Sequence, residues 1–210
     1  MMTERVIETL DCVAEGAAWL CAHEPRFGVA MVGLPPLPLR CKPDGFAELL
    51  SAIVSQQVSV ASANAIWGRL QGAGMVTADA VRQTSDESLR ALGLSRQKAK
   101  YAKALAATGI DFEALREMPS DQVMKTLTAV SGIGAWTAEI YVMFSLGRAD
   151  VFAPGDLALQ EAAKLIFDLD VRPKERALRA MAQDWSPWQS VAARIMWAYY
   201  KQSKQREGIR

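Results

Sequence analysis

Residues 127–159 of this chain read LTAVSGIGAWTAEIYVMFSLGRADVFAPGDLAL. Near the start of these residues, Gly132 and Gly134 stand one residue apart between two segments whose apolar residues recur at helical spacing. The apolar positions are Val123, Leu127 and Val130 before the glycines, and Trp136, Ile140, Met143 and Phe144 after them. Ser120 is the expected N-cap of the first helix, and Gly147 is the expected C-cap glycine of the second. The pattern predicts a helix–hairpin–helix unit over residues 120–147.

The hairpin has the features of a phosphate-binding turn. Glycine has no Cβ, so a phosphate can come close to the backbone N–H groups, and the N-terminal end of the following helix favours negative charge. We expect phosphate contacts from the backbone N–H groups of Gly132, Ile133, Gly134, Ala135 and Trp136, and from the hydroxyl of Thr137.

Asp156 follows a Pro-Gly loop and directly precedes another helical pattern. Aspartate is a preferred N-cap residue, and the amphipathic sequence LALQEAAKLIF after it would use one. Spacing alone therefore favours a structural capping role. The hairpin upstream and the Pro-Gly loop reverse that preference and favour a functional role for the Asp156 carboxylate.

Taken together, these elements resemble the helix-hairpin-helix DNA glycosylase superfamily, whose signature is the hairpin, a Gly/Pro-rich loop and an aspartate. Gly132, Gly134, Pro154, Gly155 and Asp156 match it in order and separation. The resemblance implies an all-α fold of two helical lobes with a DNA-binding cleft between them. It also implies that Asp156 is the catalytic carboxylate, because cleavage of a C1′–N bond passes through a transition state with oxocarbenium character, which a carboxylate stabilises.

Helical periodicity extends over almost the whole chain, and no alternating strand pattern is present. Besides the hairpin, helices are expected at residues 4–20, 46–70 with a break near Ser55, 77–83, 86–92, 95–107 and 156–167, and two more begin at Pro173 and Pro187. A proline-rich connector occupies residues 33–45. We predict about ten short helices in all. The resemblance assigns residues 46–156 to a central lobe, which includes the loop 148–156, and residues 1–45 with 157–210 to a terminal lobe.

Composition limits the class of protein. The chain has 210 residues, half of them hydrophobic, and no apolar run reaches the roughly twenty residues that span a membrane. The acidic, amphipathic N-terminus does not resemble a signal peptide, and the three cysteines (Cys12, Cys21 and Cys41) form no CxxC pair, so we expect a cytoplasmic protein. The net charge is only +1, but it is −3 over residues 1–50 and +4 over residues 157–210.

Within the superfamily, the most similar group is 3-methyladenine DNA glycosylase II, without the additional β domain that some members have. Three segments carry this resemblance: FAELLSAIVSQQVSV at 46–60, LGLSRQKAKY at 92–101 and WSPWQSVAARIMW at 185–197. The first implies that Gln57, with Gln56 beside it, is a wedge that fills the space left by a flipped base, although a buried or capping amide is equally compatible. The second places Arg96 and Lys98 near phosphates, although charges on a solvated helix face are at least as common.

Trp136 and Trp197 match positions that line the base pocket of the family, and indole faces attract the positive charge of an alkylated purine. Ile140 stands where the family pattern has tyrosine. Trp136 also occupies the position of the lysine that forms a Schiff base in bifunctional members, so we expect no lyase activity. Iron–sulphur members need four C-terminal cysteines, and none follows Cys41 here, so we expect no such cluster and no required cofactor.

By resemblance, the carbonyls of Thr128, Val130 and Gly132 could coordinate a monovalent cation such as Na⁺ or K⁺. The predicted function is a monofunctional glycosylase that excises alkylated purines from duplex DNA, acts as a monomer and has no membrane partner. Two alternatives remain at this point. One is a non-catalytic helix-hairpin-helix DNA-binding module, which would need the glycines but not Asp156, and the other is a glycosylase for deaminated or oxidised bases.

Overall fold

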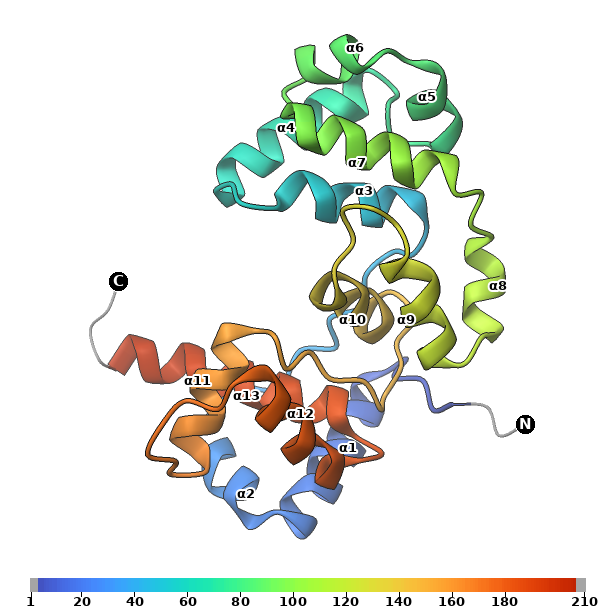
Figure 1. Cartoon of the computed structure of the whole chain (residues 1–210). Coiled ribbons are helices and arrows are strands. Elements are labelled where there is room, and N and C mark those ends of the chain that lie inside the picture. Colours follow the sequence, from blue (N-terminus) through green and yellow to red (C-terminus); the bar gives the residue numbers. More distant parts are fainter. Residues whose placement is uncertain (1–3, 207–210) are drawn as a thin grey trace. The chain divides into compact units, whose positions relative to one another are not determined.

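A computed structural model describes residues 4–206, apart from the side chain of Arg206 (Figure 1). This part of the chain contains thirteen α-helices and one short 3₁₀ helix, and it has no strand, so the predicted all-α class is confirmed. None of these helices is both long and apolar enough to cross a membrane. The only β pairing in residues 4–206 is an isolated antiparallel bridge between Val6 and Arg148.

The chain divides into two compact units. The first combines Met1–Cys41 with Val142–Arg210, and the second is Lys42–Tyr141. The boundaries therefore fall in the proline-rich connector and within the second helix of the hairpin. The loop 148–156, which the sequence prediction assigned to the central lobe, belongs to the unit formed by the two termini.

The unit of residues 42–141 contains the hairpin and the segments that lead to it. Its helices are α3 (Phe46–Ser55), α4 (Val60–Gly72), α5 (Ala78–Gln83), α6 (Asp86–Ala91), α7 (Arg96–Ala107), α8 (Phe112–Glu117), α9 (Ser120–Thr128) and the first part of α10 (Ala135–Phe144). Helix α7 packs against α3, α5 and α6. The predicted break near Ser55 is confirmed, since α3 ends there and Ser59 caps α4.

The other unit has an aromatic core. Its helices are α1 (Leu10–His23), α2 (Pro25–Met31), α11 (Leu157–Ile166), α12 (Glu175–Ala182), the 3₁₀ helix η1 (Gln183–Trp185) and α13 (Gln189–Arg206). Helix α13 packs against α1, α2 and α11. Trp185 is buried among three phenylalanines, with ring centroids 5.3 Å from Phe27, 5.2 Å from Phe152 and 5.5 Å from Phe167. This packing is the reason that segments distant in the sequence form one core.

Several predicted helix boundaries are wrong. The helix expected over residues 4–20 begins only at Leu10, because the residues before it pair with the chain near residue 148: the Ile7 N–H donates to the Gly147 carbonyl at 2.7 Å. Ser120 is the first residue of α9, and Pro119 is its N-cap. Helices α2 and α8, of seven and six residues, were not expected.

Candidate functional site

The turn between α9 and α10 requires glycine at one position and leaves space at the other. Gly132 has φ +95°, and a Cβ on it would lie 2.3 Å from Cγ of Tyr101 on α7. Gly134 differs, because a Cβ there would meet no protein atom within 4 Å. Gly134 and Ala135 are exposed at the start of α10, whose first-turn N–H groups have no acceptor within the helix. Gly132 thus serves the turn itself, whereas the surface at Gly134 is open to a ligand.

The two glutamines of the α3–α4 loop have different roles. The Gln56 side chain donates a hydrogen bond to the Gly132 carbonyl at 2.9 Å, and so ties this loop to the hairpin. Gln57 is exposed, with φ +56°, and the exposed side chains of Val58 and Val60 follow it. The buried-amide interpretation therefore describes Gln56. Gln57 has the exposure that a wedge needs, and its wedge role stays a prediction.

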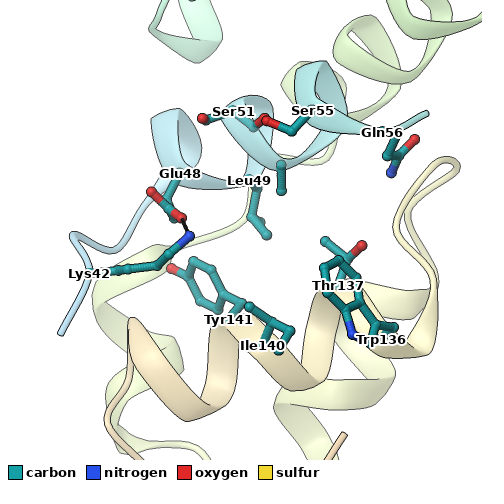
Figure 2. A pocket seen from close by; sticks show the side chains of 11 residues that line it. Lys42, Glu48, Leu49, Ser51, Ser55, Gln56, Trp136, Thr137, Ile140 and Tyr141 are labelled. Carbon is teal, nitrogen blue, oxygen red and sulfur yellow. Dashed lines mark hydrogen bonds and ion pairs between the residues drawn. The ribbon is translucent and has the colours of Figure 1, made fainter. Parts of the chain in front are cut away.

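A cavity of about 190 Å³ lies between α3 and α10 (Figure 2). It is lined by Glu48, Leu49, Ser51, Ala52, Ser55 and Gln56 from α3 and its end, by Trp136, Thr137, Ile140 and Tyr141 from α10, and by Lys42. The indole of Trp136, which is 47% exposed, stands at one end. Two residues expected in the base pocket, Trp136 and Ile140, thus line one cavity.

The other end of the cavity is polar, which the sequence did not indicate. Lys42 Nζ donates to Glu48 Oε1 at 2.6 Å, and the Tyr141 hydroxyl accepts a hydrogen bond from the Gly45 N–H at 2.8 Å. Burial raises the pKa of Tyr141 to about 12, so its hydroxyl keeps its proton at neutral pH. The two ends of the cavity therefore differ in chemistry: an indole at one, a carboxylate, an ammonium and a hydroxyl at the other (Figure 2).

In the unit formed by the termini, Asp156 is the N-cap of α11. Its Oδ1 accepts hydrogen bonds from the N–H groups of Ala158 at 2.9 Å and Leu159 at 3.1 Å. The same oxygen accepts a third from the indole Nε1 of Trp197 at 3.2 Å. The side chain of Gln160 donates to the Pro154 carbonyl at 2.8 Å, which fixes the loop before Asp156. The predicted cap is therefore present, and it orients the carboxylate toward an indole, which capping alone does not need.

Trp197 also contacts Arg40, and Arg40 lies near a second arginine, Arg194; the sequence did not indicate either arginine. The Arg40 guanidinium carbon lies 5.2 Å from the centroid of the Trp197 ring. Loss of water lowers the pKa of Arg40, and the charge of Asp156 opposes that shift. Arg194, only 2% exposed, donates through Nη2 to the Leu39 carbonyl at 2.9 Å and through Nη1 to Ser190 Oγ at 2.6 Å. Burial, and next the nearby charge of Arg40, together lower the pKa of Arg194 to about 10. Asp156 and Trp197 thus belong to one polar cluster.

Comparison with known proteins identifies the family. Residues 50–187 match the family model described as HhH-GPD superfamily base excision DNA repair protein, which covers more than half of the chain. The chain belongs to the HhH-GPD superfamily. The pattern of two hairpin glycines, Pro-Gly loop and aspartate was therefore interpreted correctly.

Relatives of this HhH-GPD protein include solved structures. A DNA-3-methyladenine glycosidase from Bacillus halodurans superposes with a TM-score of 0.83 at 30% identity, covering 97% of this chain and 95% of that one. A 3-methyladenine DNA glycosylase from Schizosaccharomyces pombe, solved in complex with abasic DNA, has a TM-score of 0.72 at 25% identity and covers 90% of this chain and 97% of that one.

Among curated sequences, DNA-3-methyladenine glycosylase 2 of Escherichia coli is 30% identical over 82% of this chain and 62% of its own length. A Bacillus subtilis relative at 32% identity is matched over 57% of this chain and 43% of its own length. This HhH-GPD chain thus spans less than two thirds of these relatives.

Lys98, expected near phosphates, is mostly buried in the described part of the chain. Its side chain is 8% exposed, and Nζ donates to the Val54 carbonyl near the end of α3 at 2.6 Å. Loss of water around the ammonium lowers the pKa of Lys98. Lys98 and Arg96, which the sequence grouped together, therefore differ in solvent exposure. Lys98 lies on the face of α7 that packs against α3, whereas Arg96 is exposed.

Replacement of Lys98 and Arg96 in this HhH-GPD chain should separate folding from DNA binding. Lys98→Met removes a donor from a buried carbonyl and should lower the free energy of unfolding by about 1–3 kcal/mol. Arg96→Met should change it by less than about 0.5 kcal/mol but make the salt dependence of DNA binding shallower, by about one in the slope of log K against log salt. Urea denaturation and salt titrations of DNA affinity measure both. If Arg96→Met binds DNA with the same salt dependence as the native protein, Arg96 does not contact a phosphate.

The hairpin carbonyls offer limited capacity for a monovalent cation. Those of Val130 and Gly132 already accept hydrogen bonds, from the Ile133 N–H at 3.0 Å and from the Gln56 side chain at 2.9 Å. A carbonyl oxygen has two lone pairs, so the oxygens of Val130 and Gly132 each keep one lone pair for a cation. Together with the carbonyl oxygen of Thr128, they are the kind of ligand that Na⁺ or K⁺ needs. The cation stays a prediction. Residues 4–206 contain no cluster of three or more histidine, cysteine, aspartate or glutamate residues suited to a metal ion.

Proposed function

We propose that this chain is a monofunctional DNA glycosylase that removes alkylated purines, of the 3-methyladenine and 7-methylguanine type, from duplex DNA and leaves an abasic site. One observation carries the proposal: in a chain of the HhH-GPD superfamily, the carboxylate of Asp156 follows the Pro-Gly loop and accepts the indole N–H of Trp197. The names of the relatives support the substrate class. The partner is duplex DNA with alkylated bases, engaged by one copy of the chain.

Binding begins at the phosphates and ends with a flipped base. The N–H groups at Gly134 and Ala135 and the guanidinium of Arg96 contact phosphates. Extrusion of the base costs a few kcal/mol, part of which Gln57 offsets when it enters the vacated space. The indole of Trp136 then attracts the base, because alkylation at N3 or N7 gives the purine a positive charge.

The chemistry requires stabilisation of positive charge on the sugar. As the C1′–N bond breaks, its electron pair leaves with the base, and the sugar acquires oxocarbenium character. The negative charge of Asp156 stabilises that sugar and orients a water molecule, which adds to C1′ and loses a proton to the carboxylate or to solvent. A cationic base departs as a neutral one, so no strong general acid is needed. With tryptophan at position 136, no amine is available there to form an imine with the sugar, so strand cleavage is not expected.

Release of bases from methylated duplex DNA tests the proposal. The purified protein should release 3-methyladenine and leave abasic sites that remain uncut until alkali is added. Borohydride should trap no covalent protein–DNA adduct. DNA binding without base release would instead support a non-catalytic DNA-binding module or a different lesion, and strand cleavage without alkali would overturn the monofunctional assignment.

A further inference from the structure

The polar end of the α3–α10 cavity holds a carboxylate that is mostly buried and accepts a hydrogen bond through only one of its two oxygens. The Glu48 side chain is 18% exposed, and its Oε1 accepts the hydrogen bond from Lys42. Within residues 4–206, its Oε2 has no hydrogen-bond donor. This oxygen still contacts solvent, and an ionised carboxylate oxygen is an acceptor only, so it can accept a hydrogen bond from a ligand.

Tyr141 adds a donor beside this acceptor. Its hydroxyl oxygen accepts the Gly45 N–H, and in the described part of the chain the hydroxyl donates no hydrogen bond of its own. A tyrosine hydroxyl is protonated at neutral pH, and burial raises the pKa of Tyr141 further, to about 12. The polar end therefore presents one acceptor and one donor, from Glu48 and Tyr141, and Figure 2 shows them on the side of the cavity away from Trp136.

The edge of a purine complements such a pair. Adenine carries an amino group beside a ring nitrogen acceptor, and guanine carries a ring N–H beside a carbonyl oxygen. Alkylation that makes the base cationic also makes these N–H groups better donors to a carboxylate. In 1,N6-ethenoadenine the added ring uses both N1 and the amino nitrogen, so this edge has no N–H group.

We propose that Glu48 is a specificity-determining residue whose carboxylate accepts a hydrogen bond from an N–H group on the edge of a base that stacks on Trp136. The inference rests on the proposed function and names the bases that this cavity takes: purines with an N–H donor on that edge. A base without one leaves Glu48 Oε2 desolvated and without a donor, which disfavours it.

Single-lesion duplexes with hypoxanthine or 1,N6-ethenoadenine test this selectivity, because both bases are neutral and only hypoxanthine has an N–H on that edge. Single-turnover rates of the native protein should favour hypoxanthine. Glu48→Ala should lower the ratio of the two rates about tenfold or more, and Glu48→Gln, whose amide oxygen still accepts, should keep most of it. Glu113→Ala, which removes an exposed glutamate from the first turn of α8, is the matched control and should leave the ratio unchanged.

Lys42→Ala separates ligand binding from a structural role. If Glu48 mattered only through its ion pair, Lys42→Ala would change the ratio as much as Glu48→Ala does, and that result would overturn the inference. We expect the ratio to stay within about threefold of the native value, because the carboxylate remains in place.

Binding of free bases, followed by tryptophan fluorescence, tests the same contact without the reaction. The native protein should bind 3-methyladenine several-fold more tightly than 1,N6-ethenoadenine, and Glu48→Ala should remove the difference. Equal affinities for the native protein, or no binding of either base, would overturn the inference. Absence of base release from methylated DNA, with this binding preference intact, would count against the proposed glycosylase activity alone.

Discussion

Asp156→Asn should lower the rate of base release at least about a hundredfold, while the protein stays folded and binds DNA. Removal of one preorganised electrostatic group from an active site typically lowers the rate by about 10²–10³. Here the lost group is a full negative charge, which in the proposed mechanism stabilises the oxocarbenium character of the sugar. Single-turnover release of 7-methylguanine from duplex DNA measures the change.

The asparagine retains what the fold needs from this position. Its amide oxygen can accept the same N–H groups of Ala158 and Leu159 and the indole N–H of Trp197, and asparagine caps helices as well as aspartate does. The midpoint of thermal unfolding should therefore shift by only a few degrees.

Asp111 supplies a matched control, because it caps α8 through two N–H groups in the same way, at 3.0 and 3.1 Å. Asp111→Asn should retain full activity. Full activity of Asp156→Asn as well would show that Asp156 is a cap and nothing more.

Local features of the sequence were sufficient for the hairpin and for the cap. Gly132, Gly134 and the Pro-Gly loop each restrict the backbone over a few residues, and Asp156 binds N–H groups two and three positions away. The same reasoning failed at residues 4–9, whose helical spacing is overridden by hydrogen bonds to the chain near Gly147. A pairing across about 140 residues leaves no periodic signal in either segment.

The candidate site was predictable only where a residue type implies its chemistry. Tryptophans at 136 and 197 were recognisable, and the cavity brings Trp136 together with Ile140. Glu48 and Lys42 form an ion pair because the connector passes beside the first turn of α3, and nothing in their spacing shows this. The burial of Lys98 was not predictable for the related reason that a helix carries charges on several faces, and only packing against α3 determines which of them loses water.

Alanine at the two hairpin glycines should affect different properties: stability at Gly132 and DNA binding at Gly134. At Gly132 it introduces a left-handed alanine and a Cβ that collides with the Tyr101 ring, at 2.3 Å from its Cγ. The backbone strain costs about 1–2 kcal/mol and the overpacking about 1–3 kcal/mol, so Gly132→Ala should lower the free energy of unfolding by about 2–5 kcal/mol. Urea denaturation measures this loss.

At Gly134 the new methyl group has free space, because no protein atom lies within 4 Å of it and the residue has no left-handed backbone. Gly134→Ala should therefore change the free energy of unfolding by less than about 1 kcal/mol. Its methyl group instead occupies the volume that a phosphate needs to reach the N–H groups at the start of α10, so the affinity for duplex DNA should fall about tenfold. Fluorescence anisotropy with an unmodified duplex measures the affinity at fixed salt. Native affinity in Gly134→Ala would mean that the hairpin N–H groups do not bind phosphate, whereas weaker DNA binding with unchanged stability would separate the ligand-binding glycine from the one that the turn requires.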